Sequence, residues 1–117
     1  MKYKRSLRVS ELIKREISTL ISLKIKDPWL KSVILTHVKV SDDLKYAKIY
    51  FRVIGKEDSK EKALKGLERA TKFIRAEIGN RTELRYVPEI QFFYDTSIDY
   101  ANHINLLLEQ IRKENHK

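Results

Sequence analysis

The 117-residue chain contains no cysteine, only three glycines and only two prolines. Without cysteine, the protein has no disulfide, no thiol nucleophile and no thiolate metal site. The scarcity of glycine and proline leaves little sequence for long flexible loops. No apolar run approaches the roughly 20 residues that a membrane-spanning helix needs, and the first residues lack the apolar segment of a signal peptide. These absences predict one compact cytoplasmic domain over residues 1–117, with a frayed tail at 113–117.

Positive charge is the dominant feature of the composition, with 25 Lys and Arg residues against 16 Asp and Glu residues. The formal net charge is +9. Residues 1–26 carry eight cations and two acids, and residues 59–86 carry eight cations and four acids. Residues 87–117 carry three cations and five acids. A polyanion such as nucleic acid is therefore expected to approach the two basic segments and to avoid the C-terminal part.

Hydrophobic residues at helical spacing predict three main helices, at 7–25, at about 60–78 and after residue 97. Ser6 is the expected N-cap of the first helix, and Gly79-Asn80 is where the second is expected to stop or bend. The third helix is expected to bury one side, formed by apolar residues from Ile98 to Ile111. Pro28 excludes helical geometry at Asp27 and so separates the first helix from the first strand.

Strands are predicted at 33–40, 46–54 and 89–95, from β-branched residues and alternating hydrophobicity. Ser41-Asp42-Asp43 is a turn sequence, so the first two strands are expected to form an antiparallel hairpin. Pro88 precedes the third strand and ends a short helical turn at 81–84. In the second strand, Ala47, Ile49, Phe51 and Val53 are expected on one face, and Tyr46, Lys48, Tyr50 and Arg52 on the other.

Several short sequence motifs occur along the chain, and their order and spacing are more specific than any one of them alone. They are Arg8-Val9, Ile25-Lys26-Asp27-Pro28, Val40-Ser41-Asp42-Asp43-Leu44, Ala47-Lys48-Ile49-Tyr50, Phe73-Ile74-Arg75 and Leu84-Arg85-Tyr86-Val87-Pro88-Glu89-Ile90, then Phe92 and Asp95. In this order and spacing, the chain resembles the bacterial ribosome-binding factor A family along nearly its whole length.

The resemblance implies an α+β domain of the type II KH-like class, with a three-stranded sheet backed by helices. The implied order is α-β-β-α-(kink)-α-β-α. KH domains hold an RNA backbone with a GxxG loop, which this chain lacks; the family has a helical kink marked by Ala-x-Gly instead. The matching positions are Ala70, Thr71 and Lys72, so Lys stands where the family has Gly. The resemblance also implies binding to RNA of the immature small ribosomal subunit.

The candidate RNA-binding residues are nine cations in and beside the predicted helices. Lys62, Lys65, Arg69 and Lys72 are spaced by three, four and three positions, which places them along one helix face. Cations in such a row displace counterions from phosphates. An ordinary solvated face, with Glu61 and Glu68 pairing to nearby lysines, is the alternative. The remaining candidates are Arg5, Arg8, Arg75, Arg81 and Arg85.

The outward face of the second strand is a rival RNA surface. Tyr46 and Tyr50 alternate there with Lys48 and Arg52, and aromatic residues on an open sheet stack bases in RRM domains. Tyrosine is also simply favoured in strands, which is the plainer explanation. Trp29 is either a partly buried anchor or an exposed stacking residue.

Catalytic chemistry finds little support in the sequence. The three histidines are scattered, so no metal site is expected. The most specific enzyme hypothesis is a nuclease in which Asp95 and Asp99 bind a divalent ion. However, the C-terminal part of the chain has a net negative charge, which would repel an RNA substrate. We predict no catalytic residue, metal or cofactor.

The sequence therefore predicts a monomeric, non-catalytic RNA-binding factor for maturation of the small ribosomal subunit. Two basic helical segments would hold the phosphate backbone of the immature RNA. Two alternatives stay open. One is a general KH-like binder of single-stranded RNA, and the other is a protein-interaction module whose basic face binds an acidic partner.

Overall fold

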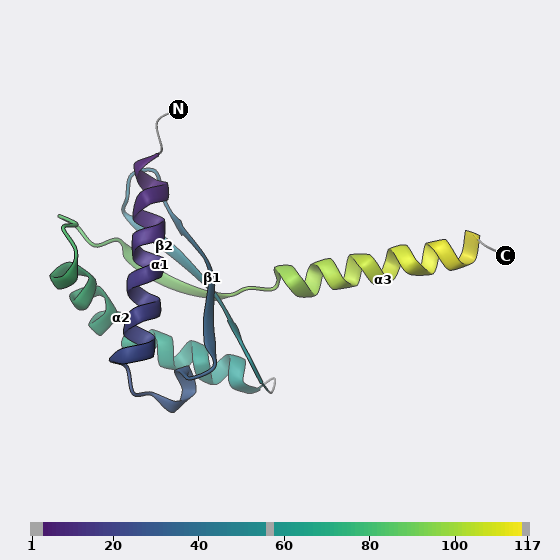
Figure 1. Cartoon of the computed structure of the whole chain (residues 1–117), viewed down its shortest axis with the longest axis horizontal. Helices are drawn as coiled ribbons and strands as arrows, with labels where there is room; N and C mark the ends of the chain where they lie inside the picture. Colours follow the sequence, from purple (N-terminus) through teal and green to yellow (C-terminus); the bar gives the residue numbers. More distant parts are fainter. Residues whose placement is uncertain (1–3, 56–57, 116–117) are drawn as a thin grey trace.

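A computed structural model describes residues 4–55 and 58–115. Its elements are helix α1 (Arg5–Leu23), the 3-10 turn η1 (Pro28–Leu30), strands β1 (Val33–Val40) and β2 (Tyr46–Val53), helix α2 (Asp58–Arg81), strand β3 (Glu89–Tyr94) and helix α3 (Ser97–Asn115). The strand order is β1-β2-β3; β1 and β2 are antiparallel, whereas β2 and β3 are parallel. Helices α1 and α2 pack on the sheet and on each other, and α3 projects away from this body (Figure 1).

The hydrophobic core lies between the sheet and the two packed helices. Apolar residues at helical spacing in α1 and α2 meet one face of β2, whose alternation was correctly predicted. The most deeply buried side chains include Ile13, Ile17, Leu20, Ile49, Phe51, Leu67, Ile74 and Ile78. Burial of each such side chain contributes about 1.5–3 kcal/mol to folding, before the entropy cost is subtracted.

The first helix begins earlier than predicted, and Ser6 is not its N-cap. Lys4 occupies the N-cap position without a side-chain hydrogen bond, while Ser6 is buried inside α1. The Ser6 hydroxyl donates to Asp42 Oδ1 at 3.4 Å. Ser10, one turn later, accepts a hydrogen bond from the Val40 amide at 3.0 Å. Packing of α1 on the hairpin, which the sequence does not reveal, therefore accompanies the earlier start of the helix, which also ends earlier than predicted, at Leu23 rather than at residue 25.

The second helix is longer than predicted. Gly79-Asn80 does not end it, and the expected helical turn at 81–84 is wrong, because α2 continues to Arg81 and residues 82–84 are not helical. Thr82 closes the helix: its amide and its hydroxyl both donate to the Ile78 carbonyl, at 3.1 and 2.7 Å. Ile78 is fully buried, so core packing holds this last turn.

The segment at Ala70, Thr71 and Lys72 lies inside one continuous helix. The predicted order counted two helices on either side of a kink, whereas the structure shows a helix that changes direction about halfway along (Figure 1). The Thr71 hydroxyl donates to the Leu67 carbonyl at 2.9 Å, a contact that bends helices. A change of direction therefore exists here without glycine at position 72.

The β1–β2 hairpin is as predicted, and its turn has a strained residue. Leu44 has φ +63°, a left-handed conformation that costs about 1–2 kcal/mol outside glycine. The turn offsets this cost with local hydrogen bonds: the Leu44 amide donates to the Ser41 carbonyl at 2.9 Å, and the Asp43 carboxylate accepts from the Ser41 hydroxyl at 2.6 Å. Leu44 also packs against the core.

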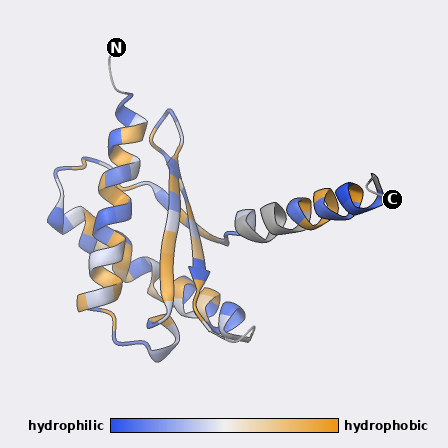
Figure 2. Ribbon diagram, turned by 45° about the vertical axis from the view of Figure 1, so that its right-hand side comes forward, coloured by the Kyte–Doolittle hydropathy of each residue, from blue (hydrophilic) through white to orange (hydrophobic). Residues whose placement is uncertain are grey.

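The third helix is not packed as predicted. Ile104, Leu107, Leu108 and Ile111 are exposed rather than buried on one side. Figure 2 shows that α3 stands clear of the body, with hydrophobic and hydrophilic residues along its C-terminal part. The helix continues through residues 113–115, and residues 116–117 lie outside the described part of the chain. Across residues 4–55 and 58–115, no helix is both long and apolar enough to cross a membrane.

Asp95 joins the three strands at the edge where α3 begins. Its carboxylate accepts from the Thr36 hydroxyl at 2.5 Å and from the Ser97 amide at 2.9 Å. The Asp95 carbonyl accepts from the Arg52 guanidinium at 2.9 Å. The Thr36 hydroxyl, followed by the bonds from Ser97, lowers the pKa of Asp95 to about 2 from its ordinary 3.8. The carboxylate is therefore ionised at neutral pH and caps α3.

We predict that Asp95→Ala lowers the free energy of unfolding by about 1 kcal/mol at pH 7, the usual cost of a lost helix cap. Because the folded-state pKa lies below the ordinary value, the ionised carboxylate stabilises the fold above pH 3.8. This contribution disappears as the pH falls from 3.8 to about 2. Urea denaturation of both proteins across this range measures the difference. Glu83→Ala, in the loop after α2, is the control, and a gap independent of pH would contradict the account.

Candidate nucleic-acid interface

Two of the predicted cations meet at one end of the molecule. Arg5, in the first turn of α1, and Arg85, in the loop between α2 and β3, line the same pocket of about 690 Å³. We call it the end pocket; Lys45, from the β1–β2 turn, also lines it. Within residues 4–55 and 58–115, neither Arg5 nor Arg85 forms an ion pair. Arg8 is exposed one turn further along α1.

Arg75, also predicted to contact RNA, instead holds the loop that carries Arg85. Its Nε donates to the Pro88 carbonyl and its Nη2 to the Val87 carbonyl, each at 3.1 Å. Pro88 is fully buried, so the loop is fixed at this point. Arg75 is therefore a structural residue whose guanidinium satisfies two backbone carbonyls between α2 and β3.

Arg69 and Trp29 form a second structural contact. The Arg69 guanidinium donates to Asp27 Oδ2 at 3.0 Å and lies 4.7 Å from the centre of the Trp29 ring. Asp27 also caps η1, because its carboxylate accepts from the Trp29 amide at 2.9 Å. Trp29 is exposed (39 %), and one face of its ring lies against this cation from α2.

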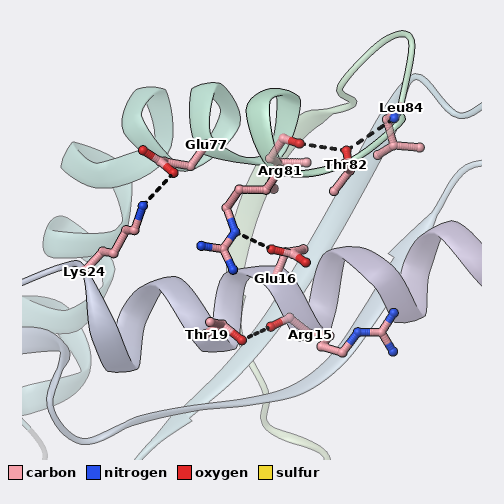
Figure 3. Close-up of polar contacts among 9 residues, drawn as sticks. Arg15, Glu16, Thr19, Lys24, Glu77, Arg81, Thr82 and Leu84 are labelled. Carbon is pink, nitrogen blue, oxygen red and sulfur yellow. Dashed lines mark hydrogen bonds and ion pairs between the residues drawn. The ribbon is translucent and has the colours of Figure 1, made fainter.

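Arg81 is occupied in a contact between α1 and α2. Its Nε donates to Glu16 Oε2 at 2.8 Å, and Lys24 pairs with Glu77 at 3.3 Å across the same interface (Figure 3). Arg69, Arg75 and Arg81 are therefore held in contacts within the fold. The other six predicted cations have exposed side chains, although Lys62 also interacts with another group of the protein; they are Arg5, Arg8, Lys62, Lys65, Lys72 and Arg85.

The exposed face of α2 presents Lys62, Lys65 and Lys72 to solvent. Lys65 and Lys72 belong to no ion pair among the residues that the structure describes. The pairing of Glu61 with Lys65 and of Glu68 with Lys72, which belonged to the alternative of an ordinary solvated face, is therefore not formed, and both ammonium groups are accessible. We call Lys62, Lys65 and Lys72 the helix cations.

The uncovered face of the sheet carries a row of rings. His37, Tyr50 and Phe93 occupy matched positions on the three strands. The Tyr50 ring stacks on Phe93 with centroids 5.6 Å apart and lies 6.0 Å from the His37 ring. Sequence analysis selected Tyr50 and missed His37 and Phe93, because only the strand register brings the three together. Base stacking on this face remains a prediction.

Among the residues described, no three His, Asp or Glu side chains are grouped closely enough to hold a metal ion. Asp95, half of the proposed nuclease pair, is instead occupied by Thr36 and by the start of α3. The end pocket places fixed positive charge beside aromatic and apolar surface.

The mixed three-stranded sheet, with α2 crossing between its two parallel strands, is a type II KH-like fold. The sequence model of the ribosome-binding factor A family matches residues 5–108, so the chain belongs to this family. The crystal structure of ribosome-binding factor A from Thermus thermophilus is similar, with a TM-score of 0.68 and 25 % sequence identity. The match covers 76 % of this chain and 93 % of that one.

Two further solved structures are similar at 25 % identity. One is the solution NMR structure of a Thermotoga maritima protein described as a candidate ribosome-binding factor A (TM-score 0.67; 83 % of this chain and 93 % of that one). The other is a homology model of the Thermus thermophilus factor, fitted into the cryo-EM map of a 30S complex (TM-score 0.62; 74 % and 91 %).

We predict that Arg75→Ala lowers the free energy of unfolding by about 2 kcal/mol, because two charge-assisted hydrogen bonds to half-buried carbonyls are lost. Lys72→Ala, on the exposed face of the same helix, should change it by less than about 0.5 kcal/mol. Urea denaturation measures both. Equal effects of the two substitutions would show that the guanidinium does not stabilise the loop.

Proposed function

We propose that this protein acts in the cytoplasm as a monomeric, non-catalytic RNA-binding factor in the maturation of the small ribosomal subunit. Two observations support the proposal: the family match covers residues 5–108, and a similar structure has been fitted into a map of a 30S complex. The protein would bind RNA of the immature subunit and leave the mature one.

The exposed cations support this proposal physically. Fixed positive charges bind RNA by releasing counterions from phosphates, which gives affinity without reading the sequence. Arg5 and Arg85 supply such charges at the end pocket, and the helix cations supply them along α2. Because their positions are set by a rigid fold, the shape of the folded RNA would determine specificity.

We predict that the double substitution Lys65→Glu and Lys72→Glu weakens binding to immature small subunits. Neither side chain makes an ion pair in the described structure, so the fold should tolerate the change. Each lost phosphate contact should reduce the slope of log affinity against log salt by about 0.7–0.9. Filter binding across a salt series measures both quantities.

Two control proteins sharpen this experiment. Lys65→Arg with Lys72→Arg keeps the charge and should keep the affinity. Arg112→Glu with Lys113→Glu makes the same change in net charge at the far end of α3 (Figure 1), and should have a smaller effect. Equal losses in both charge-reversed proteins would leave only a non-specific effect of net charge. Binding that survives removal of the RNA would instead support a protein-interaction module.

A further inference from the structure

The end pocket is assembled from three segments that lie far apart in the sequence. The first turns of α1, the β1–β2 turn and the loop before β3 each contribute to it (Figure 1). Its volume of about 690 Å³ is within the roughly 300–1,000 Å³ typical of sites for small organic groups. Val9, Leu84 and Val87 give it an apolar floor, which is continuous with the core.

Two tyrosines at the pocket are more exposed than folding requires. Tyr46 is 56 % exposed and Tyr86 is 79 % exposed, and both line the pocket. The Arg85 guanidinium lies 6.0 Å from the centre of the Tyr86 ring. A ring with this much free surface contributes little to the core, but it offers a face on which another flat ring can stack.

The charged groups at the pocket are of both signs. Arg5, Lys45 and Arg85 are cations, whereas Asp43 and Glu89 are carboxylates. The Ser41 hydroxyl, followed by the Lys45 amide, lowers the pKa of Asp43, so that this group is ionised at neutral pH. Carboxylates repel a plain anion or an acidic peptide. A nucleotide fits the mixture, because its phosphate can meet the arginines while amino groups on its base donate to carboxylate oxygens.

The walls of the pocket are held in place before any ligand binds. Arg75 fixes the Val87 and Pro88 carbonyls at one wall. Hydrogen bonds within the β1–β2 turn hold Leu44 in its left-handed conformation at another. A preformed site does not lose entropy by ordering itself around a ligand, which favours binding of a single small group.

We infer that the end pocket receives one unpaired nucleotide of the bound RNA, with its base on Tyr86 and its phosphate at Arg5 and Arg85. This inference rests on the proposed function and names the RNA element that would be recognised there. The pocket is separate from the bend at residues 70–72 and from the helix cations, none of which line it. Because the bases of a duplex are paired and stacked on one another, only an unpaired nucleotide would enter this pocket.

The test is the affinity of the full chain for a labelled random-sequence RNA pentamer, measured by fluorescence anisotropy. Tyr86→Ala should weaken binding roughly 5- to 150-fold, the range expected for one stacked base. Tyr86→Phe keeps the ring and should bind like the original protein. Binding to a short RNA duplex should be unchanged in both variants. In NMR spectra of the original protein, the pentamer should shift amide signals of Arg5 and of residues 84–86.

Several outcomes would overturn the inference: no binding of the pentamer, equal affinity of Tyr86→Ala and Tyr86→Phe, shifts confined to α2, or displacement of the pentamer by an acidic peptide. The proposed function fails by a different measurement. If immature small subunits bind the original protein, and lose affinity on reversal of Lys65 and Lys72, that function stands whatever the pentamer does.

Discussion

The parallel pairing of β2 with β3 is the constraint on which the rest of the structure depends. Parallel neighbours cannot be joined by a tight turn, so the chain must cross back through α2 before β3 begins. The loop before β3 therefore reaches the end of the sheet where β2 also starts, beside the β1–β2 turn and the first residues of α1. Arg75 secures this return by binding the Val87 and Pro88 carbonyls. The end pocket results from the topology.

The same topology divides the positive charge into two roles. Three arginines of α2 hold other parts of the chain in place. Arg69 binds Asp27 before η1, Arg75 binds the loop before β3, and Arg81 binds Glu16 of α1. The exposed ion pairs of Arg69 and Arg81 contribute about 0–1 kcal/mol each to stability, but all three contacts occupy cations that a count of Lys and Arg treats as available. The number of cations available to a polyanion is therefore smaller than the 25 Lys and Arg residues of the sequence. Arg5 and Arg85 at the end pocket, and Lys65 and Lys72 on the exposed face of α2, are candidate cations that form no ion pair among the described residues.

The sequence allowed most of the fold to be predicted where a signal is local. The alternation of hydrophobic and polar residues identified the buried face of β2. Pro28 correctly predicted an extended conformation at Asp27, where φ is −88° and ψ is 118°. The failures have tertiary causes. Ser6 is buried by the hairpin, and core packing of Ile78 carries α2 past Gly79. Helical spacing grouped Arg69 with its lysine neighbours, but Asp27, its partner, is 42 positions away. The amphipathic pattern of α3 predicted a buried side, but such a pattern does not show which part of a protein packs against the helix, and these apolar residues are exposed.

The most direct test of this account is binding to purified immature small subunits, mature small subunits and a random structured RNA, each across a salt series. The account predicts the tightest binding to the immature subunit, with log affinity falling steeply as log salt rises. Equal affinity for all three would reduce the protein to a basic RNA-binding domain without a preference for assembly intermediates. No binding to any of them would contradict the account.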